Sequence, residues 1–320
     1  GGDVLENPEI DQYIPKTSFS MEIFNMVKQG SVVLKFGNGD GPKLLISAGI
    51  HGNEPEANIA IMKYLEYIKD ESFNGTLYVI PFDIPQSTAL NSRLYDGTDP
   101  NRVANVSGTP GWNIVKFAKD NKIDYLLDVH SGSEVGKYGY IFLNSIPTTE
   151  EVSWASYVKS ITNCYSRSNG AESLGILRYY AHTQGINSIT FEVERDSIPT
   201  SVAAETEFQM IKAATQKLGF EIDPPTIISS IPTNGARNVA SIRTITVTFS
   251  EAIKEGTNWI ELVNSTINAI TFTTSIDGNV LTINTTTDLT EDRYKLMLHT
   301  GCVTDLAGNL LAGKSIRNSV

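Results

Sequence analysis

A histidine and a glutamate three residues apart, His51 and Glu54, are the first candidates for chemistry in this sequence of 320 residues. They belong to the segment HGNEPEAN at 51–58, which follows an apolar run and opens a segment with helical spacing. One turn of backbone can bring an imidazole nitrogen and a carboxylate oxygen to a shared metal ion. Taken alone the pattern is weak, because the helix dipole also favours a carboxylate near a helix N-terminus.

A third ligand would have to come from elsewhere in the chain, and His130 is the best candidate. It ends the segment DYLLDVH at 124–130. Side chains alternate along a strand, so Asp128 shares the face of His130 and could orient its imidazole. Three protein ligands would leave one zinc position for water, as catalytic zinc sites do. Of the other histidines, His182 is either a substrate contact or a satisfied polar group, and His299 is expected to be structural.

These residues need a scaffold, and the apolar pattern predicts one in which strands and helices alternate. Such alternation indicates an α/β layer fold with a mixed, mostly parallel sheet, whose sites lie beyond the carboxyl ends of the strands. The predicted strands are 43–48, 76–81, 124–130, 138–143 and 188–193, and the predicted helices are 54–68, 111–120, 151–164 and 203–218.

The segment 82–110 is long, rich in Asn, Asp, Gly, Pro and Ser, and without periodicity. Loops of that length inside compact domains are usually functional or disordered. The segment contains Arg93 and the pair Asn101 and Arg102, so we interpret it as functional. An isolated loop arginine is more often a surface residue, and only the context DPNR at 99–102 favours a functional role for Asn101 and Arg102.

Two domains are expected, 1–222 and 223–320. The boundary is the proline-rich segment Asp223-Pro224-Pro225. Beyond it, period-two alternation in TITVTF and VLTIN predicts the strands of an all-β sandwich. Cys164 and Cys302 fall in different domains, so no structural disulfide is expected.

The overall charge excludes some classes of partner. The formal net charge of −11 argues against nucleic acid and against an anionic membrane surface, since both reward clustered Lys and Arg. No apolar stretch approaches the length of a membrane-spanning helix. The opening residues Gly-Gly-Asp show no signal peptide, which a mature or trimmed chain would also lack.

Five motifs follow one another between about residues 40 and 220. They are HGNEPEAN at 51–58, Arg93, DPNR at 99–102, DVHSG at 128–132 and QGINSITFEVERD at 184–196. In this order they resemble the zinc carboxypeptidases of the carboxypeptidase A kind, with the murein peptide amidases and the succinylglutamate desuccinylase and aspartoacylase group. The compact HGNEP form and the short spacing from Arg93 to Asn101 are closer to the amidase and desuccinylase branch, whereas TQGINSITFE is closer to the peptidases.

The resemblance implies an α/β zinc carboxypeptidase-like fold and one zinc ion per chain, held by His51, Glu54 and His130. Zinc lowers the pKa of bound water from about 15.7 toward 7. A tyrosine often closes such a site on the product side. The resemblance makes Tyr180 the candidate substrate contact, with its neighbour Tyr179 as the alternative.

The resemblance also places the general base at Glu192, the glutamate of the TFE segment. Glu194 is its rival, because both acids share one face of the strand and are expected to face the cleft. Arg93 would stabilise the oxyanion that forms during attack on an amide carbonyl. Asn101 and Arg102 would bind the free carboxylate of the substrate, which a guanidinium pairs through two parallel hydrogen bonds.

Residues 225–320 carry two segments, IPTNGARNVASIRTITVTFSEAI and DLAGN, that resemble a bacterial Ig-like domain. Such modules usually act as spacers or adhesion elements on secreted and surface proteins of prokaryotes. The resemblance therefore implies an extracytoplasmic location, secreted or at the cell surface. The module could instead shape the substrate cleft.

Three functions compete at this point. The first is a metallocarboxypeptidase acting on peptides, including those of a cell wall, and the second is an N-acyl amino acid deacylase or amidase that uses the same zinc. Both would act on a peptide or acyl amino acid with a free carboxylate, with no nucleic acid partner and no membrane span. The third is an inactive surface-binding protein, and the retention of every candidate ligand and catalytic residue argues against it.

Overall fold

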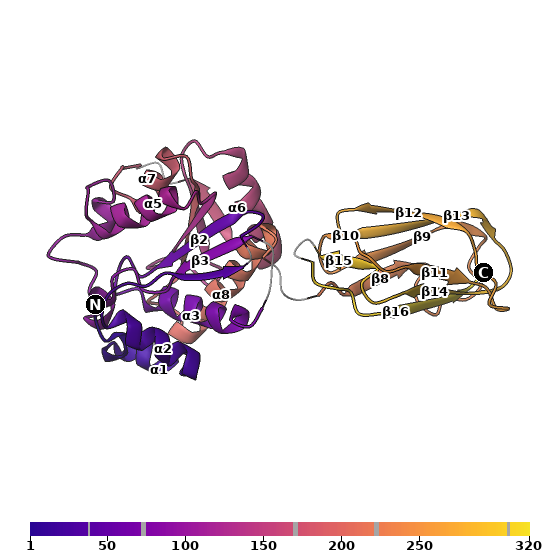
Figure 1. The fold of residues 1–320 in the computed structure, drawn as a ribbon, viewed down its shortest axis with the longest axis horizontal. Coiled ribbons are helices and arrows are strands. Elements are labelled where there is room, and N and C mark those ends of the chain that lie inside the picture. The colour runs from indigo at the N-terminus through magenta and orange to yellow at the C-terminus, as the bar shows by residue number, and fades with distance from the viewer. Residues whose placement is uncertain (38, 72–74, 169–171, 221–223, 306–307) are drawn as a thin grey trace. The chain divides into compact units, whose positions relative to one another are not determined.

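The computed structural model describes residues 1–37, 39–71, 75–168, 172–220, 224–305 and 308–320. The chain folds into two compact units, Gly1–Phe220 and Glu221–Val320, and each is described by itself (Figure 1). Within the described residues, no helix combines the length and the apolar character needed to cross a membrane.

The first unit is built around a sheet that, within the described residues, has seven strands in the order β1-β3-β2-β4-β7-β5-β6. The central strands β3, β2, β4 and β7 run parallel to one another. β1 and β5 are antiparallel to their neighbours β3 and β7, and β6 is parallel to β5. This mixed, mostly parallel sheet confirms the predicted α/β class. The strands are β1 (Leu34–Gly37), β2 (Lys43–Ala48), β3 (Thr76–Ile80), β4 (Tyr125–Gly132), β5 (Tyr140–Leu143), β6 (Tyr165–Ser168) and β7 (Asn187–Glu194).

Helices cover both faces of this sheet (Figure 1). α5 and α7 place apolar side chains such as Ile114 and Leu177 against the face that carries Leu45 and Leu126. α3 and α8 pack on each other and on strands β4 and β7, and α6 packs on α8. The helices are η1 (Val4–Glu6), α1 (Pro8–Tyr13), α2 (Ser18–Val27), α3 (Pro55–Ile68), α4 (Pro85–Ala89), η2 (Pro100–Arg102), α5 (Pro110–Asp120), α6 (Thr149–Thr162), α7 (Leu177–Thr183) and α8 (Thr200–Lys217).

The predicted elements recur with ends that differ by a few residues, and α6 shows why. The helix begins before Glu151 because Thr148 forms a capping box with it: each side chain accepts a hydrogen bond from the other residue's backbone N–H. It ends before Cys164 because Asn163 takes a φ of 59°, a left-handed conformation that stops a helix. The pattern did not predict α1, α2, β1, β6 or α7, nor the short helices α4 and η2 inside 82–110.

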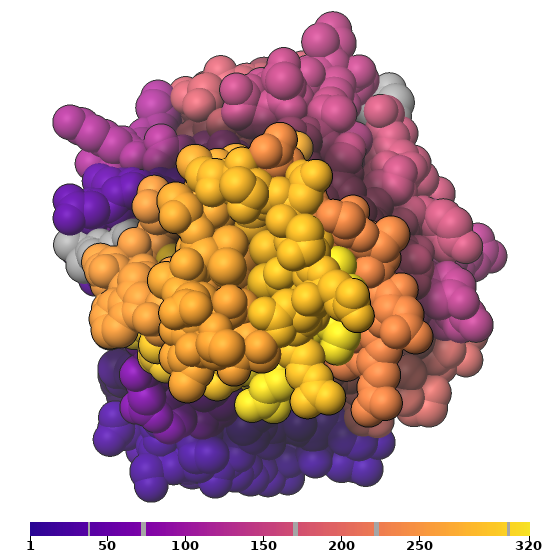
Figure 2. Space-filling model, turned by 90° about the vertical axis from the view of Figure 1, so that its right-hand side faces the viewer, coloured from indigo at the N-terminus to yellow at the C-terminus, as the bar shows by residue number. Residues whose placement is uncertain are grey.

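The second unit is an antiparallel β-sandwich, as predicted, and Figure 2 shows it space-filling in orange and yellow. Its sheets have the orders β12-β13-β9-β8, β11-β14-β16 and β10-β15. Alternate residues of β9, including Ile245 and Val247, join Leu281, Ile283 and Leu296 in one apolar core. The strands are β8 (Ile227–Ile231), β9 (Ile242–Phe249), β10 (Ile253–Glu255), β11 (Ile260–Val263), β12 (Phe272–Asp277), β13 (Val280–Leu289), β14 (Arg293–Leu298), β15 (Val303–Asp305) and β16 (Lys314–Ser319). Cys164 and Cys302 are both free and buried.

Candidate metal centre

The turn between β2 and α3 carries His51 and Glu54. Gly49 enters this turn with a φ of +88°, which L side chains rarely adopt. Gly52 lies against the backbone of Ser87, where a Cβ atom would come within 2.0 Å of the Ser87 carbonyl carbon. The two glycines let the chain turn tightly from strand to helix. As a result His51 and Glu54 are buried, at 3% and 4% exposure.

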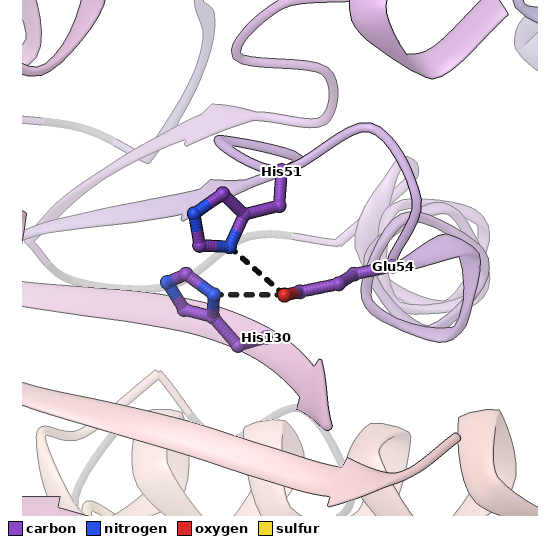
Figure 3. A group of neighbouring side chains, drawn as sticks. All are labelled: His51, Glu54 and His130. Atoms are coloured by element: carbon purple, nitrogen blue, oxygen red, sulfur yellow. Dashed lines mark hydrogen bonds and ion pairs between the residues drawn. The ribbon is translucent and has the colours of Figure 1, made fainter. Parts of the chain in front are cut away.

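His130 reaches the same place from the carboxyl end of β4, the parallel neighbour of β2. Its Nδ1 atom lies 2.8 Å from Glu54 Oε2, and His51 Nδ1 lies 2.8 Å from Glu54 Oε1 (Figure 3). One ligand atom from each of the three residues falls within 4.8 Å of the others. The structure therefore brings together the three predicted ligands.

The outer nitrogen of each imidazole faces a carboxylate. His130 Nε2 lies 3.0 Å from Asp128 Oδ1, as the alternation along β4 predicts. His51 Nε2 lies 2.9 Å from Oδ1 of Asp99, the aspartate of the DPNR motif. A carboxylate behind a ligand imidazole fixes its orientation and raises its basicity toward a metal. Two imidazoles and one carboxylate, each buried, form a donor set suited to zinc.

Asp99 also holds Arg93. Arg93 Nε donates to Asp99 Oδ2 at 3.0 Å, and Nη2 lies 2.9 Å from the same oxygen. The third nitrogen, Nη1, lies 3.6 Å from Glu54 Oε1. Burial alone would raise the pKa of Asp99, but the hydrogen bond and charge of His51, with Arg93, outweigh it and lower that pKa. One carboxylate thus positions both His51 and Arg93.

The charged groups of this cluster shift one another's pKa values. Burial opposes ionisation of Glu54, but the charges and hydrogen bonds of His130 and His51 outweigh it and lower the pKa of Glu54. Burial likewise disfavours the imidazolium form of His130, yet Asp128 and Glu54 hold its pKa well above the ordinary value. The charges needed to receive a cation are therefore already in place, and a metal would displace the proton on His130.

Glu192 stands beside His130, because His130 and Glu192 are register partners on the parallel strands β4 and β7. Its carboxylate lies over Gly132, where a Cβ atom would come within 2.1 Å of Glu192 Oε1. Burial raises the pKa of Glu192, and the negative charge of Glu54 adds to the effect, while His130 opposes it. A carboxylate with a raised pKa beside a metal centre is suited to accept and return a proton.

These side chains line one small pocket of about 150 Å³. Besides the residues above, the predicted pair Asn101 and Arg102 lines this pocket. The amide oxygen of Asn101 accepts a hydrogen bond from Leu177 N at 2.8 Å, and Arg102 Nη1 donates to Asn101 O at 2.8 Å. The lining residues are His51, Glu54, Arg93, Asn101, Arg102, His130, Phe142, Ile176, Arg178, Thr190 and Glu192.

The profile of the succinylglutamate desuccinylase/aspartoacylase catalytic domain matches residues 40–218. The chain belongs to this family. A second profile, that of the bacterial Ig-like domain, matches residues 221–317, so the second unit is an Ig-like domain. Both matches confirm the resemblances predicted from the motifs. No curated protein sequence matches the chain.

Solved structures with a similar fold include the cell shape determinant Csd4 from Helicobacter pylori. Its apo form is 14% identical, with a TM-score of 0.50 over 91% of this chain and 100% of that one. A tripeptide-bound form of Csd4 is 13% identical, with the same TM-score and coverage. A metallo-carboxypeptidase from Burkholderia cenocepacia is 17% identical, with a TM-score of 0.46 over 63% of this chain and 70% of that one. At these identities the Csd4 likeness is one of fold alone.

Two expectations for this desuccinylase/aspartoacylase family member need correction. Glu194 does not face the pocket: its carboxylate accepts hydrogen bonds from the backbone amides of Val135 and Gly136, at 2.8 and 2.9 Å, and from Asp196 and Ser197. The strand ends there, and the loops on either side turn their amides toward it. Because its carboxylate is occupied by these backbone amides, Glu194 is a weaker candidate for the general base than Glu192.

Tyr180 is also absent from the pocket lining. Its ring packs against the apolar cluster that α5 and α7 form with the sheet. Tyr179 instead stacks on His182, with ring centroids 6.2 Å apart. The helical spacing of α7 turns Arg178 rather than either tyrosine to the pocket.

Arg178 is the residue that the motifs missed. It lines the pocket at 2% exposure, and its Nη1 donates to Asn144 Oδ1. Burial lowers the pKa of Arg178, although Asp128, Glu172 and Glu151 oppose that shift, and an arginine stays charged. Arginines are rarely buried without a charged or polar partner. A sequence prediction of α7 would have placed Arg178 on its buried face and so marked it as a candidate site residue.

We expect Glu194 to stabilise the loops around the site in a pH-dependent way. Backbone hydrogen bonds overcome burial and lower its pKa from 4.5 to about 2. A lowered carboxylate pKa adds stability that is complete above pH 4.5 and is lost as the pH falls toward 2. Glu194→Gln should therefore cost about 2 kcal/mol at pH 7, from lost charge-assisted hydrogen bonds, and much less near pH 3.

Unfolding free energies of the two proteins at pH 7 and pH 3, from urea titrations, measure this difference. A Glu194→Gln penalty of the same size at both pH values would contradict the assignment of Glu194 as an ionised clamp.

Proposed function

We propose that this protein is a zinc-dependent hydrolase that cleaves an amide bond next to a free carboxylate. The observation that carries the proposal is the pocket itself, which collects a buried His-Glu-His ligand set, a carboxylate with a raised pKa and three arginines. Family membership supports hydrolysis at such a centre. The ligands would be His51, Glu54 and His130. The chemistry that zinc supplies in such a site is Lewis acidity, which lowers the pKa of water toward about 7.

Glu192 would move the proton in this reaction. Its carboxylate lies at the pocket in the space that Gly132, which has no side chain, leaves beside the strand of His130. As a base it would take a proton from the attacking water at a carboxylate oxygen. As the protonated acid, which burial favours, it would then give that proton to the leaving amine.

Arg93 would stabilise negative charge on the carbonyl oxygen. Two of its nitrogens are fixed by Asp99, so the guanidinium is held in place before the substrate arrives. Because the orientation already exists, little reorganisation is needed as the charge develops. Arg93 side-chain exposure of 40% leaves it accessible to a substrate.

Asn101 and Arg102, which line the pocket, would bind the free carboxylate of the substrate. Peptides are the first candidates, supported by Csd4, a protein of similar fold that has been solved with a bound tripeptide. A peptide would place its last residue in this pocket, beside Asn101 and Arg102. The second candidate is an N-acyl amino acid. The buried Arg178 favours it, because a further positive charge in so small a pocket suits a compact substrate with two anionic groups.

The Arg102→Ala variant tests this proposal on matched substrates. We expect kcat/KM to fall about 30-fold on peptides and acyl amino acids with a free carboxylate, because a charge-assisted pair is lost. The same compounds with an amidated carboxyl group should be poor substrates for the wild type, and the variant should lower their turnover little further. Steady-state kinetics of the zinc-loaded proteins measure both.

Equal losses on acids and amides would contradict the role of Arg102. A zinc-loaded wild type that hydrolyses no peptide and no acyl amino acid of such a panel would refute the hydrolase and favour a binding protein.

A further inference from the structure

The side chain that is hydrogen-bonded to Arg178 carries no charge. Its Nη1 atom donates to the amide oxygen of Asn144, a neutral acceptor that is completely buried. Its Nε atom is buried and has no hydrogen-bond partner among the residues that the structure describes. A carboxylate in the place of Asn144 would pair with the guanidinium and compete with any anion in the pocket.

The orientation of the Asn144 amide is fixed from behind. Its Nδ2 atom donates to Glu151 Oε1 at 3.1 Å and to Ser188 O at 3.2 Å. Both of these atoms are acceptors only, so the amide must turn its NH2 group toward them. The oxygen of Asn144 is thereby presented to Arg178.

Glu151 is the centre of this buried network, at 0% exposure. Its Oε1 atom accepts from Ser188 N at 2.8 Å and lies 2.9 Å from His182 Nδ1, while Oε2 accepts from Thr148 N at 3.0 Å. These contacts tie the start of α6 to β7 and α7. Ser188 Oγ also donates to the carbonyl oxygen of Arg178 at 2.7 Å, so the backbone of Arg178 is held as well.

We propose that Asn144 and Glu151 are positioning residues, which hold Arg178 with a neutral partner instead of a bonded carboxylate, so that its guanidinium can bind an anionic group of the substrate. The inference rests on the function proposed above. Asn144 supplies the neutral contact, and Glu151 fixes which atom of Asn144 makes it. Among the contacts that the described residues make, no carboxylate is hydrogen-bonded to the guanidinium: Glu151 contacts it through Asn144, and Asp128 and Glu172 act on it through their charge alone.

The Asn144→Ala variant tests the contact. We expect KM for substrates with an anionic group to rise about tenfold, as for a lost hydrogen bond to a charged group, with kcat changed less than about threefold. The double variant Asn144→Asp with Glu151→Gln tests the charge, because it keeps the volume and the net charge but moves the carboxylate against Arg178. We expect its KM to rise at least as much, whereas a purely structural role predicts kinetics close to the wild type.

Thr148→Ala is the matched control. It removes the capping hydroxyl of the same helix but leaves the carboxylate contacts of Glu151, including the one from the Thr148 backbone. We expect an unchanged KM. A rise in KM as large as that of Asn144→Ala would mean that loosening α6 is enough, and would overturn the inference. Circular dichroism of each variant identifies any that do not fold, in which case the remaining buried variant decides.

Binding of succinate by calorimetry separates this inference from the proposed function, because it needs no turnover. Weaker succinate binding in Asn144→Ala, by about tenfold, supports the inference even if the wild type hydrolyses nothing and the proposed function fails. Active wild type with unchanged KM and succinate affinity in both buried variants keeps the function and overturns the inference. A wild type that binds no succinate also overturns it.

Discussion

Replacing Glu192 by glutamine is expected to lower kcat about 1,000-fold while the protein keeps its metal. The amide has the shape of the carboxylate but cannot accept the proton of the attacking water. Glu192 is not one of the three residues whose ligand atoms cluster, so the metal site should stay intact in the variant. Kinetics on the best substrate, with metal content measured by mass spectrometry on the same samples, check both halves of the expectation.

Glu194→Gln is the matched control, since it is the same substitution two residues along β7. Its carboxylate is bound by four loop amides, so the variant should lose stability and retain most of its turnover. An inactive Glu194→Gln beside a fully active Glu192→Gln would reverse the assignment of the base. In the wild type, activity should rise with pH through the raised pKa of Glu192, because the base must be ionised to act.

The clustering of the three candidate metal ligands could be predicted from the sequence because each sits at a recognisable junction. His51 and Glu54 share one tight turn between strand and helix, and His130 lies near the carboxyl end of the apolar strand β4. Parallel strands bring such ends together at one edge of a sheet, so local patterns were enough to place all three. Asp128 followed from the same alternation.

The residues that the sequence could not place depend on packing rather than on local pattern. Asp99 belongs to the DPNR motif, but its contacts with both His51 and Arg93 arise only when the 82–110 segment folds over the turn after β2. Glu194 follows Glu192 at the strand period, and only the loop amides around it divert it from the pocket. Strand alternation gives a side chain's face but not its partners.

Helix α7 was not predicted from the sequence, and the side chains that it brings to the pocket were therefore not predicted either. Its seven residues, Leu177–Thr183, are too few for a clear helical period, so the sequence left open which side chains of this segment meet the site. In the helix, Arg178 lines the pocket and Tyr180 packs on the apolar core. The family resemblance indicated Tyr180, whereas no motif of the sequence indicated Arg178. The role of the Ig-like unit and an extracytoplasmic location stay predictions.

His51→Ala and His130→Ala should both reduce the metal content from one ion per chain to less than about a tenth, because two remaining ligands bind zinc poorly. The two variants should nevertheless differ in stability when metal is removed. His130 lies between two buried carboxylates, Glu54 at 2.8 Å and Asp128 at 3.0 Å, and its raised pKa makes it a cation there. Its removal leaves these carboxylates facing each other and should cost about 3 kcal/mol.

Loss of His51 should reduce the stability less than loss of His130. Its outer partner Asp99 also pairs with Arg93, so that carboxylate keeps a counter-charge when the imidazole is lost, and we expect a cost of about 1 kcal/mol. His299→Ala, in the Ig-like unit, provides the same substitution away from the site and should retain the metal. Mass spectrometry gives the metal content, and urea unfolding after chelation gives the two free energies. Equal losses of stability in His51→Ala and His130→Ala would show that His130 does not balance the buried carboxylates, and retained metal in either would remove that residue from the ligand set.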